Sequence, residues 1–142
     1  MSGIERLLVA YDGTPLAEEA LEHALATYPN AEITVLHVID YIEESYSAEA
    51  LVGFDELRER ARGRSEDLLA HAKDLAEAHD REVSTATRFG KPAREIVDYA
   101  EEHDVDTIVM GSHGRPLVTR VLLGSVAETV IRRAPTPVVV VR

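Results

Sequence analysis

The stretch that decides the fold is TIVMGSHG at residues 107–114, followed after nine residues by GSVAETV at residues 124–130. Its first residues predict a short buried strand, and its last ones an amphipathic helix. The glycines between them are spaced G-x2-G-x9-G-S. Glycine permits positive φ and leaves backbone N–H groups accessible, and a helix N-terminus attracts anions. The stretch therefore predicts a phosphate-binding loop between a strand and a helix.

Alternating apolar runs and helical patterns extend on both sides of this stretch. Strands are expected at residues 4–10, 33–39, 82–89, 107–110 and 138–141, the third of them at a sheet edge. Helices are expected after Thr14-Pro15, over residues 55–79, from Gly90-Lys91-Pro92, and after Ser125. Strands rich in Val, Ile and Leu that alternate with helices indicate a parallel sheet covered on both faces.

Helical periodicity predicts which side of each helix faces the sheet. In the long helix the expected inner residues are Leu57, Ala61, Leu68, Ala72, Leu75 and Ala76. In the last helix they are Val126, Val130 and Ile131. Residues 41–54 have no clean period, so they form either an ordered lid or a loop.

The element order β-α-β-α-β-α-β-α-β predicts a doubly wound α/β fold, a three-layer sandwich of the flavodoxin-like or Rossmann-like type. In either arrangement a ligand binds at the carboxyl ends of the strands that flank the topological switch point. At those ends this chain carries Asp12, Val38-Ile39 and the Gly111 loop.

Length and composition predict a single domain over residues 1–142, with 45% hydrophobic residues to form one core. No apolar run reaches the roughly 18 residues needed to span a membrane. The N-terminus lacks the basic and apolar regions of a secretory signal. With no cysteine there is no disulfide, thiolate nucleophile or Cys-ligated metal. A cytoplasmic location is therefore expected.

The net charge of −11 argues against a nucleic-acid-binding surface. An acidic chain with few lysines suits a salty cytoplasm, where salt screens the repulsion between carboxylates, and we favour a halophilic source. An arginine-biased genome is the alternative explanation. The glycine-rich stretch is the basic exception, with Arg115, Arg120, Arg132 and Arg133 against Glu128 alone between residues 111 and 133.

Other chemistry is not indicated. The six histidines include no H-E-x-x-H motif and no pair four residues apart, so no protein-built metal site is expected. Gly90-Lys91 lacks the Walker A pattern, and no G-x-S-x-G motif occurs. We identify no catalytic residue. A divalent ion such as Mg or Mn could still be carried on the phosphates of a ligand.

Four blocks of this sequence resemble the universal stress protein family, in particular its nucleotide-binding branch. They are LLVAYDGT near the start, LHVID at residues 36–40, MGSHGR…LLGSVAETV at residues 110–130, and TPVVVVR at the end. The resemblance covers the whole length, and the complete G-x2-G-x9-G-[ST] spacing is its most specific part.

The resemblance implies a five-stranded parallel sheet of order 3-2-1-4-5 with ATP, ADP or AMP at the switch point. Asp12 would then bond the ribose hydroxyls, Val38 would meet the adenine through its backbone, and Met110 would pack near the base. Arg115 lies in the same loop. The residues that would hold the phosphates are Gly111, Gly114, Gly124, Ser125 and Val126.

Each of these residues also has an ordinary structural explanation. Asp12 before Gly13 is a common turn residue, and Val38 and Met110 suit a core. Ser125 could be a simple helix cap and Gly124 a turn glycine. The spacing of the whole set favours the ligand-binding interpretation.

The last strand, Val138–Val141, carries no charge and would lie at a sheet edge in this order. An open apolar edge promotes strand pairing. We therefore expect a homodimer in which this strand pairs with its symmetry mate, as the resemblance also implies.

Three functions are compatible with these residues. The leading one is a dimeric regulatory protein of the stress response that binds an adenine nucleotide. The second is a slow ATPase or autophosphorylating enzyme, for which the sequence offers no evident general base or arginine finger. The third is an interaction module with an empty site.

Overall fold

The computed structural model describes residues 5–40, 53–113 and 123–142. Residues 41–52, which hold most of the expected lid or loop, lie outside this part of the chain. The helices and strands in the described residues are, in order, β1 (Arg6–Ala10), α1 (Pro15–Thr27), β2 (Glu32–Ile39), α3 (Phe54–Ala78), β3 (Ser84–Phe89), α4 (Pro92–Glu102), β4 (Thr107–Gly111), α5 (Ser125–Arg133) and β5 (Val138–Val141).

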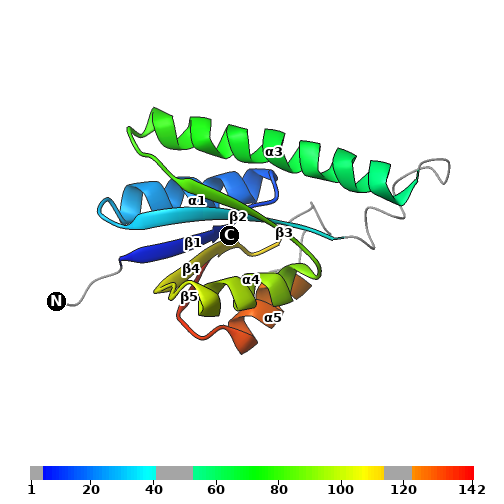
Figure 1. The fold of residues 1–142 in the computed structure, drawn as a ribbon. Coiled ribbons are helices and arrows are strands. Elements are labelled where there is room, and N and C mark those ends of the chain that lie inside the picture. The colour runs from blue at the N-terminus through cyan, green and yellow to red at the C-terminus, as the bar shows by residue number, and fades with distance from the viewer. Residues whose placement is uncertain (1–4, 41–52, 114–122) are drawn as a thin grey trace.

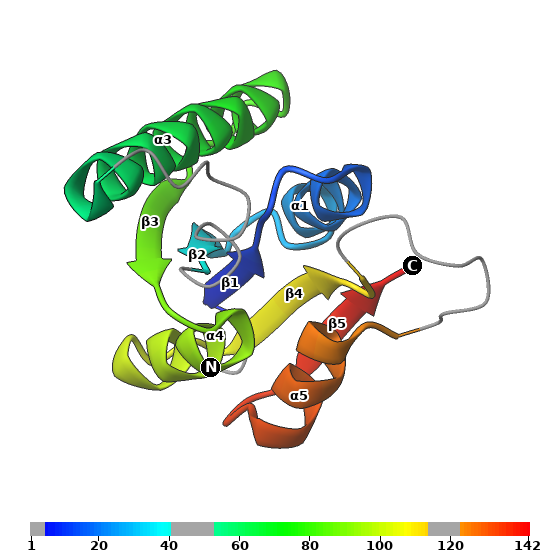
Figure 2. The same cartoon turned by 90° about the vertical axis from the view of Figure 1, so that its right-hand side faces the viewer.

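The strands form one parallel sheet in the order β3-β2-β1-β4-β5. The expected doubly wound order 3-2-1-4-5 is therefore confirmed, with β3 and β5 at the two edges. Helices α1 and α3 cover one face of the sheet, and α4 and α5 cover the other (Figures 1 and 2).

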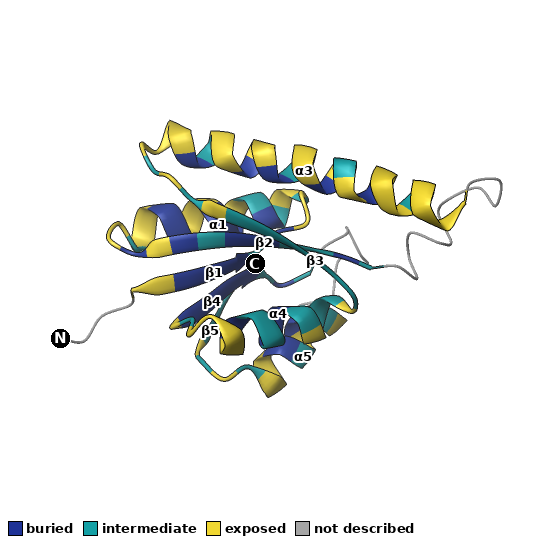
Figure 3. Ribbon diagram, viewed as in Figure 1, coloured by how far each residue is buried: buried dark blue, intermediate teal, exposed yellow. Residues whose placement is uncertain are grey.

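Burial is deepest along the central strands (Figure 3). In β1 successive side chains point to opposite faces of the sheet. Leu7 and Val9 join the apolar cluster beneath α1 and α3, whereas Leu8 joins the cluster beneath α4 and α5. The sheet thus has a core on each face, which explains why its strands read as continuous apolar runs.

The first helix begins where the sequence predicts. Thr14 is its N-cap residue, and its hydroxyl accepts a hydrogen bond of 3.4 Å from the Ala17 N–H, while Pro15 occupies the first helical position. This start places the N-terminus of α1 directly after the carboxyl end of β1.

The inner stripe of α3 differs from the expected one. Its buried residues are Ala61, Ser65, Leu69, Ala72 and Ala76. The leucines at positions 57, 68 and 75 are only partly buried. Small side chains let the helix axis approach the sheet closely, so the longer leucines flank the contact.

One expected core residue of α5 is also misplaced. Ile131 is 45% exposed, whereas Ala127 and Val130 are buried. Ala127 and Val130 lie three residues apart on one helix face, and Ile131 is turned about 100° from Val130. The expectation that Ile131 faces the core is therefore wrong.

Candidate functional site

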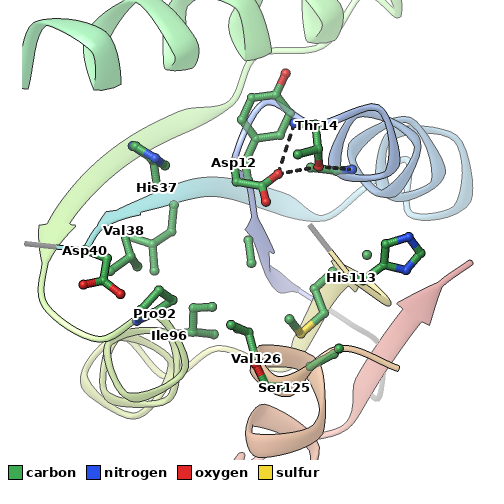
Figure 4. Close-up of a pocket in the computed structure, with 18 of the residues that line it drawn as sticks. Asp12, Thr14, His37, Val38, Asp40, Pro92, Ile96, His113, Ser125 and Val126 are labelled. Atoms are coloured by element: carbon green, nitrogen blue, oxygen red, sulfur yellow. Dashed lines mark hydrogen bonds between the residues drawn. The ribbon is translucent and has the colours of Figure 1, made fainter. Parts of the chain in front are cut away.

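The carboxyl ends of β1, β2 and β4 open into a cavity of about 540 Å³ (Figure 4). Its position is the topological switch point, because β1 is flanked by β2 on one side and β4 on the other. Seven of the residues singled out in the sequence line it: Asp12, Val38, Met110, Gly111, Gly124, Ser125 and Val126. Gly114 and Arg115 lie outside the described residues.

One end of the cavity presents the bare backbone edge of β2. The pairing of β1 with β2 ends at Ala10 and Leu36, followed by a bond of 2.9 Å from the Tyr11 N–H to the Leu36 carbonyl. Alternate residues of a parallel strand direct their backbone groups to the same neighbour. Val38 therefore directs its N–H and C=O toward the side of β1, beyond the point where β1 has ended.

Apolar side chains line this end, together with Asp40. Leu36, Val38 and Met110 come from the sheet, and Ile96 comes from α4. Figure 4 shows Val38 and Asp40 on one side of this region, with Pro92 and Ile96 beside them. The result is a slot between the sheet and α4 that suits a flat apolar group with polar atoms on its edge.

Asp12 supplies a carboxylate between the two ends of the cavity. Its Oδ1 accepts hydrogen bonds from the Thr14 N–H at 3.1 Å and from the Thr14 hydroxyl at 2.5 Å. Gly13 has a φ of +78°, which makes this short turn possible. The Asp12 side chain is exposed, so a ligand in the cavity has access to it.

The neighbouring Tyr11 is almost fully buried, and its hydroxyl has no hydrogen-bond partner among the described residues. Burial, together with the charges of Glu18 and Asp12, raises the pKa of Tyr11 to about 12. The hydroxyl therefore stays protonated and neutral at physiological pH.

A partly buried chain of polar side chains, which the sequence did not reveal, lies beside the Val38 edge. The Nδ1 atom of His37 is 2.8 Å from the Ser65 hydroxyl, which is 2.8 Å from the Thr87 hydroxyl. These residues belong to β2, α3 and β3. Burial lowers the pKa of His37, and the charge of Asp12 opposes that shift. The register of β2 with β3 pairs His37 with Thr87, and the packing of α3 on the sheet adds Ser65.

The opposite end of the cavity is the N-terminus of α5. Gly124 is the N-cap residue, its carbonyl accepts from the Glu128 N–H at 2.9 Å, and no side chain caps this turn. The first N–H groups of a helix have no partner within it. Those of Ser125 and Val126 lie at the positive end of the helix dipole beside the cavity. Because Gly124 holds the N-cap position, the alternative reading of Ser125 as the helix cap is wrong.

Gly111 and Gly124 are the two glycines of the motif that the structure describes. Neither is needed here for a positive φ. Gly124 has a φ of −78°. A Cβ there would lie 3.2 Å from the Ser112 carbonyl oxygen, to which the Gly124 N–H donates at 2.6 Å. A Cβ on Gly111 would lie 3.0 Å from Cγ of Leu16. Both glycines therefore lie where the loop, α1 and the start of α5 pack closely, and a larger residue would force these neighbours to shift.

The described residues form neither a cluster that could bind a metal ion nor a helix that could span a membrane. No group of three or more His, Cys, Asp or Glu side chains there is arranged to hold a metal ion. None of the helices there is both long and apolar enough to cross a membrane.

Comparison with known proteins places this geometry in context. The sequence model of the universal stress protein family matches residues 3–142. Universal stress protein MJ0531 of Methanocaldococcus jannaschii is 34% identical over 140 residues, covering 97% of this chain and 82% of that protein.

Solved structures agree with the sequence matches. The structure of MJ0577, also from M. jannaschii, superposes with a TM-score of 0.84 at 34% identity, covering 97% of this chain and 95% of that one. A universal stress protein solved in complex with cAMP has a TM-score of 0.73 at 28% identity, covering 99% of each chain.

Proposed function

The chain belongs to the universal stress protein family, and from this premise we propose that it is a cytoplasmic, nucleotide-binding regulatory protein of the stress response. Its ligand is ATP or a related adenine nucleotide, bound in the cavity at the switch point. One observation carries the proposal. A β2 edge without a neighbouring strand lies at one end of that cavity, and a helix N-terminus without a side-chain cap lies at the other.

The β2 edge matches adenine. The Watson–Crick edge of adenine offers an amino donor at position 6 next to an acceptor at position 1, which complements the C=O and N–H of a single residue such as Val38. Guanine reverses both groups. The apolar slot formed by Leu36, Met110 and Ile96 would then enclose the faces of the base.

The remaining lining residues match the rest of a nucleotide. Asp12 would accept hydrogen bonds from the ribose hydroxyls. The N–H groups of Ser125 and Val126 would hold the phosphates. Gly111 and Gly124 would contribute by carrying no side chain beside them. Gly114 and Arg115 belong to the same proposed loop. Mg or Mn would be carried on the phosphates rather than by protein ligands.

Thermal unfolding with and without Mg-ATP tests this proposal. Ligand at 100 times its dissociation constant adds about 2.7 kcal/mol to the folded state. That corresponds to a rise of roughly 5–10 °C in melting temperature for a chain of this size. We expect a smaller rise with GTP, and a smaller rise with ATP in Asp12→Ala. The control Asp74→Ala, an exposed aspartate on α3, keeps the full rise.

The absence of a shift with ATP, ADP, AMP and cAMP alike would contradict nucleotide binding. Equal shifts in Asp12→Ala and Asp74→Ala would locate the ligand away from Asp12.

We propose in addition that the protein is a homodimer joined through Val138–Val141. This edge strand is half-exposed along its length, and the exposed Ile131 belongs to the helix that precedes it. We also propose that the acidic surface, with a net charge of −11, adapts the protein to a salty cytoplasm.

A further inference from the structure

The turn between β1 and α1 ties two polar side chains together at the cavity. Thr14 donates to Asp12 Oδ1 through both its N–H, at 3.1 Å, and its hydroxyl, at 2.5 Å. Figure 4 shows the second oxygen of the Asp12 carboxylate turned away from Thr14, into the cavity. The two oxygens of one carboxylate thus have separate roles, one structural and one facing the place of a ligand.

The turn that holds this carboxylate is itself fixed on both sides. The Thr14 hydroxyl also caps α1 by accepting from the Ala17 N–H. Gly13, at a φ of +78°, packs so close to α3 that a Cβ there would lie 3.0 Å from Leu68 Cδ1. An exposed aspartate on a surface turn is ordinarily free to rotate about its side-chain bonds. Here two hydrogen bonds from Thr14 restrain that rotation.

We propose that Thr14 is a positioning residue that holds the Asp12 carboxylate ready for the ribose hydroxyls and so sets a preference for ribonucleotides over 2′-deoxyribonucleotides. This inference rests on the proposed function. A fixed acceptor favours a ligand that carries the matching hydroxyl, since no ordering of the carboxylate is needed on binding. A ligand without that hydroxyl leaves the oriented oxygen unpaired.

The size of the preference follows from the exposure of Asp12. Water can replace a missing hydroxyl at an exposed carboxylate, so discrimination is far below the extreme values of fully buried sites. We expect wild-type protein to prefer ATP over 2′-deoxy-ATP by about tenfold, the effect of one hydrogen bond to a charged group.

The experiment is isothermal titration of ATP and of 2′-deoxy-ATP, each with Mg²⁺, into wild type, Thr14→Val and Thr14→Ser. Valine keeps the shape of threonine without its hydroxyl, and serine restores the hydroxyl. We expect Thr14→Val to reduce the preference to about twofold and Thr14→Ser to retain it. Thr27→Val, at the other end of α1, is the matched control and retains the preference.

The ratio of the two affinities separates positioning from a structural role. Loss of the helix cap lowers the stability of Thr14→Val, but a lower stability affects both ligands equally and leaves the ratio unchanged. Equal weakening of both ligands in Thr14→Val would therefore overturn the inference. So would a wild type that binds the two ligands equally, even though nucleotide binding itself would stand. A wild type that binds neither would overturn the proposed function as well.

Discussion

At the scale of single residues, Asp80 and Asp104 occupy backbone positions that favour glycine. Their φ values are 56° and 51°, and each lies two residues beyond the end of its helix, α3 or α4. Both helices end in the same way, with the Arg81 N–H bonded to Ala76 O and the Val105 N–H to Ala100 O. Glycine adopts this left-handed position without steric cost, and an acidic side chain there opposes the helix dipole.

We therefore expect Asp80→Gly and Asp104→Gly to stabilise the protein by about 0.5–1 kcal/mol each, and additively, because the two sites belong to different helices. Urea unfolding of both variants and their combination measures this. Asp74→Gly, in the interior of α3, is the control and is expected to destabilise by about 0.3 kcal/mol, the difference in helix propensity between aspartate and glycine. Destabilisation by all three variants would contradict the prediction.

His37 gives a prediction about pH. Burial lowers its folded-state pKa below the ordinary value of 6.5. As the pH falls, His37 therefore takes up a proton in the unfolded chain before it does so in the folded chain. The stability due to neutral His37 is complete above pH 6.5 and declines as the pH falls below that value. His37→Asn keeps a polar partner for Ser65 and removes this titration.

Urea unfolding of wild type and His37→Asn between pH 7.5 and pH 5.5 measures the effect. We expect the free energy of unfolding of wild type to fall more steeply with decreasing pH. Parallel profiles would show that His37 does not titrate differently on folding.

At the scale of elements, periodicity and end signals in the sequence were sufficient to predict the strands, their parallel arrangement and the start of α1 at Thr14. They failed where contact with a neighbour decides the outcome. Ser65 interrupts an apolar stripe and is buried because His37 and Thr87 meet it there. Ile131 is apolar but exposed, since α5 lies at an edge of the sheet.

The candidate site was predictable to the extent that it follows from topology. Asp12, Val38 and Gly111 lie at or just beyond the carboxyl ends of neighbouring strands, so the sheet order gathers them. The reason for the glycines was not predictable, because it lies in distances to Leu16 and to Ser112 that no pattern in the sequence encodes.

Arg81, which follows α3, bonds to α1 and to the segment that leads into β2. Its guanidinium donates to the Leu25 carbonyl of α1 at 2.8 Å and to the Ala31 carbonyl before β2 at 2.9 Å. Both carbonyls are left without these charged donors in Arg81→Ala. We expect that variant to lose about 2 kcal/mol of stability.

Arg94→Ala is the matched control for Arg81→Ala. The Arg94 side chain is 76% exposed, and its ion pair within the described part of the chain is a 3.9 Å contact with Asp98 on its own helix, so we expect a loss below about 0.5 kcal/mol. Urea unfolding of both variants compares them, and equal losses would show that the bridge to α1 contributes nothing.

At the scale of the whole molecule, 26 acidic residues against 15 basic ones repel one another in the folded chain. Salt reduces the range of this repulsion from about 30 Å at 0.01 M to about 3 Å at 1 M. We expect the melting temperature to rise with KCl concentration, most steeply below about 1 M. A melting temperature that stays level or falls over this range would contradict adaptation to a salty cytoplasm.

The open edge of β5 decides the proposed assembly. Pro137 O and Val141 O accept from β4, so these residues and Val139 direct their backbone groups to that strand. Val138 and Val140 therefore direct theirs outward, to the open edge.

Proline at position 140 removes an outward N–H while sparing the bonds to β4, and proline is tolerated on edge strands. We expect Val140→Pro to sediment as a folded monomer and wild type as a dimer. Thr85→Pro makes the equivalent change on the opposite edge strand, β3, and should remain dimeric. A dimer that survives Val140→Pro would exclude this interface, because an isologous β5 pair loses the same hydrogen bond twice.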